Sequence, residues 1–197
     1  MIKYFYLSFF FLLSSCSIDL GYIQLFRDSI TENRIIVDDQ LTKSINSSFL
    51  KASKGRNDAI FVLSNSNNGF DTWIGSGMER IVTYKGFIIK TQGLDFDIYH
   101  HDSEIIADLF TRKDFSSRAD LTNPNYRFAE FYFKIFEESH KVDGCYLELT
   151  YLKKLKAIGF SSKDWYCYDI NLNILKSRQR LNPKDKAINL EFHYKFE

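Results

Sequence analysis

Two adjacent histidines stand among carboxylates in the middle of the chain and suggest metal chemistry. The pair is His100 and His101, and the neighbouring acids are Asp95, Asp97, Asp102 and Glu104. Imidazole and carboxylate groups bind divalent metals. Adjacent residues on a strand point to opposite faces, so both imidazoles cannot easily serve one ion there. We therefore interpret this segment as a solvated loop that holds no metal.

Pairs of acids are the second candidate, because two carboxyls about 5–10 Å apart can cleave a glycosidic bond. Glu130 with Glu148, and Glu137 with Glu138, are such pairs in principle, but a chain with 25 acids contains some by chance. The stretch Gly75-Ser76-Gly77 lacks the following Lys-Ser/Thr of a phosphate-binding loop and is interpreted as a turn. We predict no catalytic residue and no cofactor.

The thiol of Cys16 is the third candidate, and its chemistry is attachment of a lipid. An apolar run from Tyr4 to Leu13 follows Lys3. A membrane span needs roughly 20 apolar residues, whereas the core of an export signal has about 7–15. The small residues Ser14 and Ser15 before Cys16 resemble the bacterial lipobox, so residues 1–15 are expected to be a signal peptide and Cys16 the lipidated first residue of the mature protein. The alternatives are a signal cut elsewhere and an uncleaved anchor.

Composition favours one β-rich domain over residues 16–197. Removing 15 of the 197 residues leaves 182, which suits a single domain. The 26 basic and 25 acidic residues balance once Lys3 is lost, which argues against a nucleic-acid partner. Aromatic residues make up 17% of the chain and suit pleated sheet.

Cys145 and Cys167 remain as an even pair after lipidation of Cys16. An exported protein is exposed to oxidising conditions, so a disulfide between them is a possibility. Two separate buried thiols are the alternative, since free cysteine is often buried.

Short apolar stretches separated by turn residues indicate antiparallel strands after residue 54. The early stretches lie at Ile60–Ser64 and Phe70–Ile74, separated by a turn at Asn65–Gly69, and at Arg80–Tyr84 and Phe87–Thr91, which flank Lys85-Gly86. The clearest strand runs from Tyr126 to Phe136 with an alternating pattern, and Cys145 to Tyr151 alternates likewise. Lys153 to Ile158 suits either a continuation or a helical turn.

The two ends of the chain complete the prediction. Three final strands are expected at Asp164–Ile170, Ile174–Leu181 and Ala187–Phe196, and a short amphipathic helix near the N-terminus is indicated by Ile23, Phe26 and Ile30. The predicted fold is mainly β, an antiparallel β-barrel or sandwich-like single domain with a short N-terminal helical segment.

Two stretches resemble known lipoproteins. The segment Gly77-Met78-Glu79-Arg80-Ile81-Val82-Thr83-Tyr84-Lys85-Gly86-Phe87-Ile88-Ile89-Lys90-Thr91-Gln92-Gly93-Leu94 is similar to a hairpin of the YjbF family lipoproteins, also called group four capsule polysaccharide lipoproteins. Trp165-Tyr166-Cys167-Tyr168-Asp169, Lys176-Ser177-Arg178-Gln179 and Pro183 resemble that family's terminal strands, although Arg180 replaces an aromatic residue.

The resemblance implies an outer-membrane lipoprotein, facing the periplasm, that supports secretion or assembly of capsule or exopolysaccharide and is not an enzyme. Its implied partners are outer-membrane secretion proteins, the membrane through the lipid anchor, and polysaccharide. A periplasmic glycan-processing enzyme and a general envelope assembly factor are the alternatives.

Four aromatic residues are candidates for binding sugar rings or a partner. Tyr132 lies on the mixed face of the clearest strand, and Trp165, Tyr166 and Tyr168 lie near the terminal strands. Aromatic side chains offer large contact areas with a polar group at one end. The alternative is that they pack in the core or at the sheet edge.

The lipid prediction is tested by Cys16→Ala. Because the thiol is the acceptor, the variant is expected to lose all fatty-acid labelling in cells fed radiolabelled palmitate, while the unaltered chain is labelled. Labelling of the variant at the level of the unaltered chain would contradict lipidation at Cys16.

Overall fold

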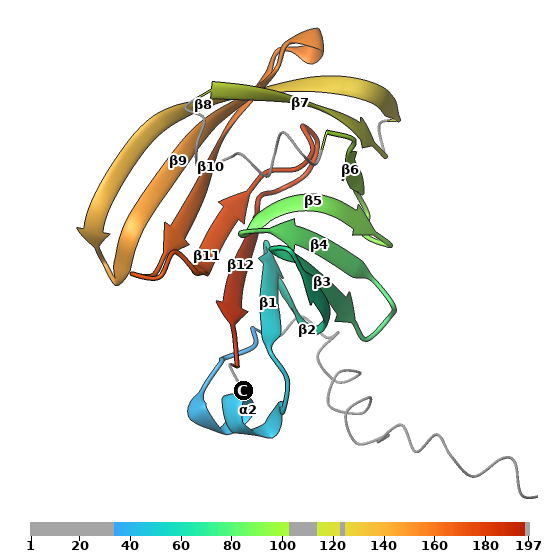
Figure 1. Ribbon diagram of the computed structural model, residues 1–197. Helices are drawn as coiled ribbons and strands as arrows, with labels where there is room; N and C mark the ends of the chain where they lie inside the picture. The colour runs from blue at the N-terminus through green and yellow to red at the C-terminus, as the bar shows by residue number, and fades with distance from the viewer. Residues whose placement is uncertain (1–33, 103–113, 123–124, 196–197) are drawn as a thin grey trace, which may run out of the picture.

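A computed structural model describes residues 34–102, 114–122 and 125–195. Within these residues twelve strands form a closed antiparallel barrel, in which strands that follow one another in the chain pair and β1 pairs with β12 (Figure 1). The strands are β1 (Phe49–Lys54), β2 (Asn57–Asn67), β3 (Phe70–Gly75), β4 (Arg80–Tyr84), β5 (Phe87–Gln92), β6 (Ile98–His100), β7 (Asp114–Leu121), β8 (Tyr126–Val142), β9 (Cys145–Leu155), β10 (Phe160–Tyr168), β11 (Ile174–Gln179) and β12 (Ile188–His193). The expected β-rich fold is confirmed.

Three hairpins turn on two residues with positive φ at both positions. These turns are Asn68-Gly69, Lys85-Gly86 and Asp143-Gly144, and their geometry matches the twist of the flanking strands. Gly86 has a second reason to be glycine, because a Cβ there would lie 2.4 Å from Cγ1 of Ile174 on β11. The expected hairpin at Lys85-Gly86 is therefore confirmed.

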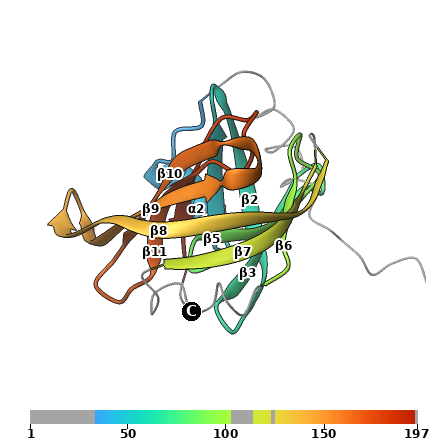
Figure 2. The ribbon, with the colours of Figure 1, turned by 90° about the horizontal axis from the view of Figure 1, so that it is seen from above.

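Several strands differ in length from the sequence prediction. The turn expected at Asn65–Gly69 is shorter, since β2 continues to Asn67 after a bulge near Leu63. The strand expected from Tyr126 to Phe136 is β8, which extends to Val142. Its far end forms a hairpin with β9 that projects from the barrel (Figure 2). A strand that faces solvent forms the same backbone hydrogen bonds whether its residues are polar or apolar. The composition of the sequence therefore does not show where β2 and β8 end.

The segment after Tyr151 contains both structures that the sequence allowed. β9 continues to Leu155, and the 3-10 helix η2 (Lys156–Ile158) then ends at Gly159, whose φ is 65°. The three terminal strands form the expected meander, with β10 beginning at Phe160.

Opposite walls of the barrel touch. Around the ring β5 and β11 are six strands apart in either direction. The side-chain amide of Gln179 on β11 nevertheless donates to the carbonyl of Gly86 at 2.7 Å and accepts from the backbone N–H of Ile88 at 3.0 Å. The hydroxyl of Tyr168 donates to the Lys85 carbonyl at 3.1 Å. The barrel is therefore flattened, which explains why its sequence is also typical of a sandwich.

Aromatic rings fill much of the interior. Phe87 lies at the centre of one group, with ring centroids 5.5 Å from Phe133 and 6.3 Å from Tyr166. Trp73 is fully buried, and its indole N–H donates to the hydroxyl of Thr83 at 3.0 Å. Edge and stacked contacts of this kind add to the stabilisation from burial.

The segment before β1 lies against the outside of the barrel. The short helix α2 (Asp39–Ser44) is capped by the Asp38 carboxylate, which accepts from the Leu41 N–H at 2.8 Å. A second apolar cluster joins this segment to β1 and β2; its members are Ile45, Phe49 and Ile60, with Ile35, Val37 and Leu41 packed against them. The helix expected around Ile23, Phe26 and Ile30 lies outside the described residues.

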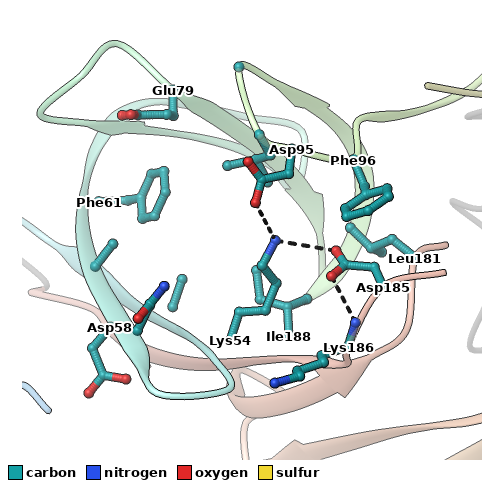
Figure 3. Close-up of a pocket in the computed structure, with 15 residues that line it drawn as sticks. Lys54, Asp58, Phe61, Glu79, Asp95, Phe96, Leu181, Asp185, Lys186 and Ile188 are labelled. Atoms are coloured by element: carbon teal, nitrogen blue, oxygen red, sulfur yellow. Dashed lines mark hydrogen bonds and ion pairs between the residues drawn. The ribbon is translucent and has the colours of Figure 1, made fainter. Parts of the chain in front are cut away.

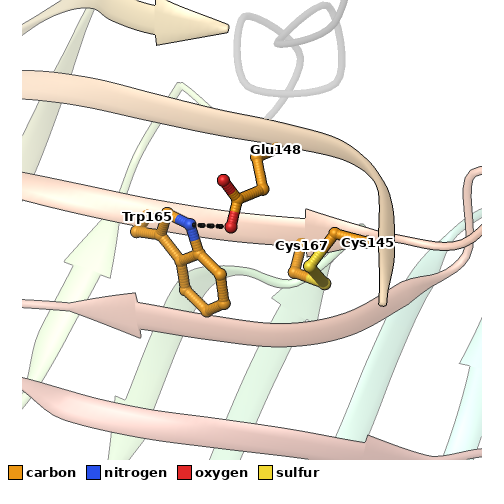
Figure 4. Close-up of a disulfide and its surroundings, with 4 residues drawn as sticks. All are labelled: Cys145, Glu148, Trp165 and Cys167. Carbon is orange, nitrogen blue, oxygen red and sulfur yellow. Dashed lines mark hydrogen bonds between the residues drawn. A yellow bond between two sulfur atoms is a disulfide. The ribbon is translucent and has the colours of Figure 1, made fainter. Parts of the chain in front are cut away.

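A disulfide joins β9 to β10. Cys145 and Cys167 are bonded with their Cα atoms 5.4 Å apart (Figure 4). The bond closes a loop between positions 22 residues apart. Loop-closure entropy assigns about 3 kcal/mol of stabilisation to such a bond.

The contact across the barrel is tested by Gln179→Leu, which keeps the side-chain volume and removes both hydrogen-bonding groups. The buried Gly86 carbonyl and Ile88 N–H then lose these partners, so we expect the free energy of unfolding to fall by about 2–3 kcal/mol. Urea denaturation followed by tryptophan fluorescence measures the loss. Arg178→Ala, at an exposed position on the same strand, is the control and should change stability by less than ~0.5 kcal/mol. Equal small effects would show that Gln179 does not hold the walls together.

Candidate functional site

Two of the four candidate aromatic residues belong to the core. Tyr166 and Tyr168 are each 1% exposed, because alternate residues of β10 point inward. Burial raises the pKa of both hydroxyls well above its usual range. Of the two possibilities left open by the sequence, packing in the core holds for Tyr166 and Tyr168, and they are not available for binding at the surface. The sequence could not decide this, because it does not say whether these two residues or Trp165 face inward.

Tyr132 and Trp165 do lie on the outer surface, where each is held by a carboxylate. The Trp165 indole N–H donates to Glu148 on β9 at 2.9 Å (Figure 4). The Tyr132 hydroxyl donates to Glu130 two residues earlier on β8, and this bond raises the pKa of the tyrosine. Both side chains are half-buried, so each ring presents only part of its surface.

Exposed lysines surround these two aromatic residues. Lys134 on β8, Lys154 on β9 and Lys163 on β10 are exposed, and the strands pair so that Tyr132 lies opposite Lys154. The ammonium group of Lys156, which follows β9, lies 4.6 Å from the centre of the Tyr132 ring. A shallow groove of about 410 Å³ is lined by residues that include Asp114, Ser116, Lys154 and Lys156. We call this outer surface of β8, β9 and β10 the basic face.

Phe136 adds a third aromatic ring to the basic face. Its side chain is 52% exposed. The ammonium group of Lys163 lies 3.5 Å from the centre of its ring. Cation–π contacts of this kind keep both groups at the surface and restrict their rotamers.

The structure separates the first acid pair considered from the sequence and exposes the second. Glu148 lies opposite Ser139 on β8, which places Glu130 nine residues away along that strand, roughly 30 Å at about 3.3 Å per residue. Glu137 and Glu138 are exposed near the projecting hairpin, and Glu138 lies 3.3 Å from His140.

The two adjacent histidines occupy different environments. His100 is on β6 and 2% exposed, with Nδ1 2.9 Å from the Ser117 hydroxyl, so the expected solvated loop is wrong for this residue. His101 points outward, and its Nε2 lies 3.1 Å from Asp120. Burial, with a smaller effect from Lys153, lowers the pKa of His100 to about 3.

No group of three or more His, Cys, Asp or Glu side chains in the described part of the chain is arranged to hold a metal ion.

A cavity of about 390 Å³ opens at one mouth of the barrel (Figure 3). Phe61, Leu181 and Ile188 form apolar parts of its lining. Lys54 lies between two carboxylates from different loops, 3.2 Å from Asp95 and 3.4 Å from Asp185. These two ion pairs tie the β5–β6 and β11–β12 connections to the end of β1, so this mouth has a charged rim above an apolar floor.

A buried ion pair lies inside the wall of the barrel. Lys153 and Asp164 are both nearly inaccessible, and their charged atoms are 2.6 Å apart. Asp164 also accepts from the backbone N–H of Arg180 at 3.0 Å, and Lys153 donates to the Arg180 carbonyl. A buried pair is tolerated only when further hydrogen bonds satisfy its members, as here.

Sequence reasoning missed the mouth cavity and the buried pair. The positions of Lys54, Asp95 and Asp185 become related only when three distant segments meet at one end of the barrel. The burial of Lys153 could have been predicted from the sequence. It is spaced two residues from Tyr151 and Leu155, which point inward on β9, as does Leu149. A lysine on the inward face of a strand requires a buried partner.

Cys16 lies outside the described residues. Within them, no helix has the length and hydropathy of a membrane span.

Comparison with known proteins finds a likeness to a solved structure. No family model matches the chain, and no curated protein matches it in sequence. Among solved structures it is similar to the hypothetical lipoprotein YmcC from Escherichia coli, with a TM-score of 0.63 and 13% identity, over 92% of this chain and 97% of that one. At this identity the likeness shows the fold alone. The chain therefore shares the fold of YmcC over 92% of its length.

The buried imidazole of His100 predicts a loss of stability in acid. An unfolded histidine titrates near 6.5 and folded His100 at about 3, so between these values only the unfolded chain is protonated at this site. Stability should fall as the pH drops through this window, by at most ~1.4 kcal/mol per pH unit from this group. Urea denaturation at several pH values should give a shallower fall for His100→Gln than for the unaltered protein.

The control for that experiment is His140→Gln, which alters an exposed histidine on β8. It should leave the pH dependence unchanged. Several carboxylates with lowered pKa also lose stabilisation in acid, and comparing the variants with the unaltered protein removes their contribution. Parallel profiles for the unaltered protein and His100→Gln would contradict the buried, neutral state of His100.

Proposed function

We propose that this protein is an outer-membrane-anchored lipoprotein that faces the periplasm and supports capsule or exopolysaccharide secretion by binding glycan or partner proteins. The lipobox at Cys16 supports the anchor, and the shared fold with the lipoprotein YmcC supports the envelope location. The resemblance of residues 77–94 and 165–183 to the YjbF family supports the role in secretion.

The observation that carries the binding role is the basic face. Three aromatic side chains and three lysines lie on three paired strands, so the sheet holds them at fixed spacing without a loop to order, and Lys156 follows directly after β9. Rigid presentation lowers the entropy cost of binding. The partners under this proposal are the outer-membrane secretion proteins and the polysaccharide itself, and no catalytic step is required.

The enzyme alternative has one observation in its favour, because Asp95 and Asp185 converge in the mouth cavity (Figure 3). Both contact Lys54 within 3.4 Å, which brings the carboxylates near the separation that glycoside hydrolysis uses. Cleavage also needs a protonated acid that is free to reach the leaving oxygen. Here both carboxylates are engaged by the ammonium group that they share, which favours a structural role.

The binding role is tested by measuring secreted polysaccharide in cells that lack the protein and carry one variant. Cys16→Ala should impair secretion because it removes the protein from the membrane. Asp95→Asn, Asp185→Asn, Glu130→Gln and Glu148→Gln should each leave secretion near the level of the unaltered chain. Immunoblots of membrane fractions control for protein level and location.

Two outcomes would contradict this proposal. A stable, correctly located Asp→Asn or Glu→Gln variant that fails to restore polysaccharide secretion would favour the enzyme alternative. Accumulation of uncleaved glycan in the deletion strain would favour it too, because loss of a binding protein stalls export without leaving unprocessed substrate. Unchanged secretion in the deletion strain would contradict a role in polysaccharide export.

A further inference from the structure

We infer that the basic face binds an acidic polysaccharide, meaning a glycan that carries carboxylate groups along its chain. This inference rests on the proposed function and names the ligand class of the surface formed by β8, β9 and β10. It depends on charge, on the aromatic rings and on the position of the face in the barrel.

Charge is the first argument. Lys134, Lys154, Lys156 and Lys163 form no ion pair with any carboxylate of the described residues, in contrast to Lys51, Lys54 and Lys153. The register places Lys134 and Lys163 on either side of Leu152 in one row across the sheet. Neighbouring strands are ~4.8 Å apart, so these two lysine positions are separated by about 10 Å. Unpaired cations at such spacing suit a chain with repeated negative charges.

The nearby acids keep their charge but form no ion pair with these lysines among the described residues, and exposed Glu137 lies at the end of the face near Trp165. Glu130 accepts the hydroxyl of Tyr132, and Glu148 accepts the indole N–H of Trp165. Asp114 is the acid that lines the groove, beside three lysines. The described part of the groove therefore has a positive excess, although the chain as a whole is balanced.

The aromatic rings favour sugar over other anions. Tyr132, Phe136 and Trp165 are spread over β8 and β10, and Glu148 fixes the orientation of the Trp165 ring. The apolar faces of pyranose rings pack on aromatic side chains, which provide a large contact area with few rotatable bonds. Carboxylates of the same glycan can reach the lysines between the rings.

The position of the face leaves it accessible to a long polymer. Around the ring β8 lies five strands from β1 in one direction and seven in the other. The segment from Ile35 to Ile45 packs on the outer side of β1 and β2, so it covers a different side of the barrel. The outer side of a barrel wall is convex, and a flexible glycan can follow it where a flat lipid surface would touch only a few lysines.

The test measures binding of two polysaccharides to the lipidated mature protein in non-ionic detergent by calorimetry. Polygalacturonate is the acidic probe, and dextran of similar length is the neutral one. Polygalacturonate should bind at least ~10-fold more tightly, and its affinity should fall at least ~5-fold between about 50 and about 300 mM salt as the charges are screened.

Variants locate the binding surface. Lys134→Glu/Lys154→Glu/Lys163→Glu should weaken polygalacturonate binding at least ~10-fold. The matched control is Lys43→Glu/Lys90→Glu/Lys184→Glu, which makes the same change of charge at exposed positions on α2, β5 and the β11–β12 connection. It should change affinity by less than about threefold. Tyr132→Ala on the basic face should weaken binding several-fold, whereas Tyr99→Ala, which alters the similar Lys90–Tyr99 pair, should not.

Specified outcomes would overturn the inference. An equal loss of polygalacturonate affinity in the two triple variants would mean that the net charge of the protein, and not the basic face, determines binding. Equal affinity for dextran would mean that the lysines do not contribute to binding. Equal or tighter binding of polyglutamate, or of vesicles containing anionic lipid, would assign the face to an acidic protein or to a membrane. Circular dichroism checks that each variant is folded. If polygalacturonate fails to bind while secretion still depends on the protein and on Cys16, the inference is wrong and the proposed function stands.

Discussion

Twelve strands closed into one barrel would enclose a lumen wider than side chains readily fill, and the contact between β11 and β5 resolves this constraint. A barrel of about eight strands has an interior that side chains can fill, whereas a barrel of about sixteen or more strands encloses a channel. Gln179 bridges the two opposite walls through the backbone of Gly86 and Ile88. Gly86 allows that approach because a larger residue would collide with Ile174. The flattening lets aromatic side chains complete the core, and the mouth cavity remains near one end.

Closure itself depends on residues at the two ends of the described chain. β1 pairs with β12 from Phe49 opposite His193 to Lys54 opposite Ile188. The Ser48 hydroxyl accepts from the Lys195 N–H at 2.8 Å, and the Lys195 ammonium group donates to the carbonyl of Thr42 at 2.6 Å. Without this pairing both strands would expose an edge on which other chains could add. The segment from Ile35 to Ile45 is thus packed beside the seam of the barrel.

Local patterns predicted the strands better than they predicted the surfaces. Alternation identified β8, and the Lys85-Gly86 turn identified the β4–β5 hairpin, because both signals act between neighbours in sequence. Which face of β10 lies inside depends on pairing with β9 and β11, so Tyr166 and Trp165 could not be assigned from spacing alone. His100 was misplaced for a related reason, since a short strand among acids looks like a loop until β7 supplies Ser117 as a buried partner. Residues that meet only through closure, such as Lys54 and Asp185, left no signal in the sequence.

The same closure gives the three surfaces distinct positions and distinct chemistry. The segment from Ile35 to Ile45 covers the outer side of β1 and β2. At the rim of the mouth cavity Lys54 pairs with Asp95 and Asp185. On the basic face Glu130 and Glu148 accept from aromatic side chains, and the four lysines form no ion pair with a described residue. Because an unpaired cation gains more from a new anion than a paired one does, the basic face is the surface on which an acidic partner changes the electrostatic energy most. We therefore place the proposed binding role on β8, β9 and β10, on a different side of the barrel from residues 35–45.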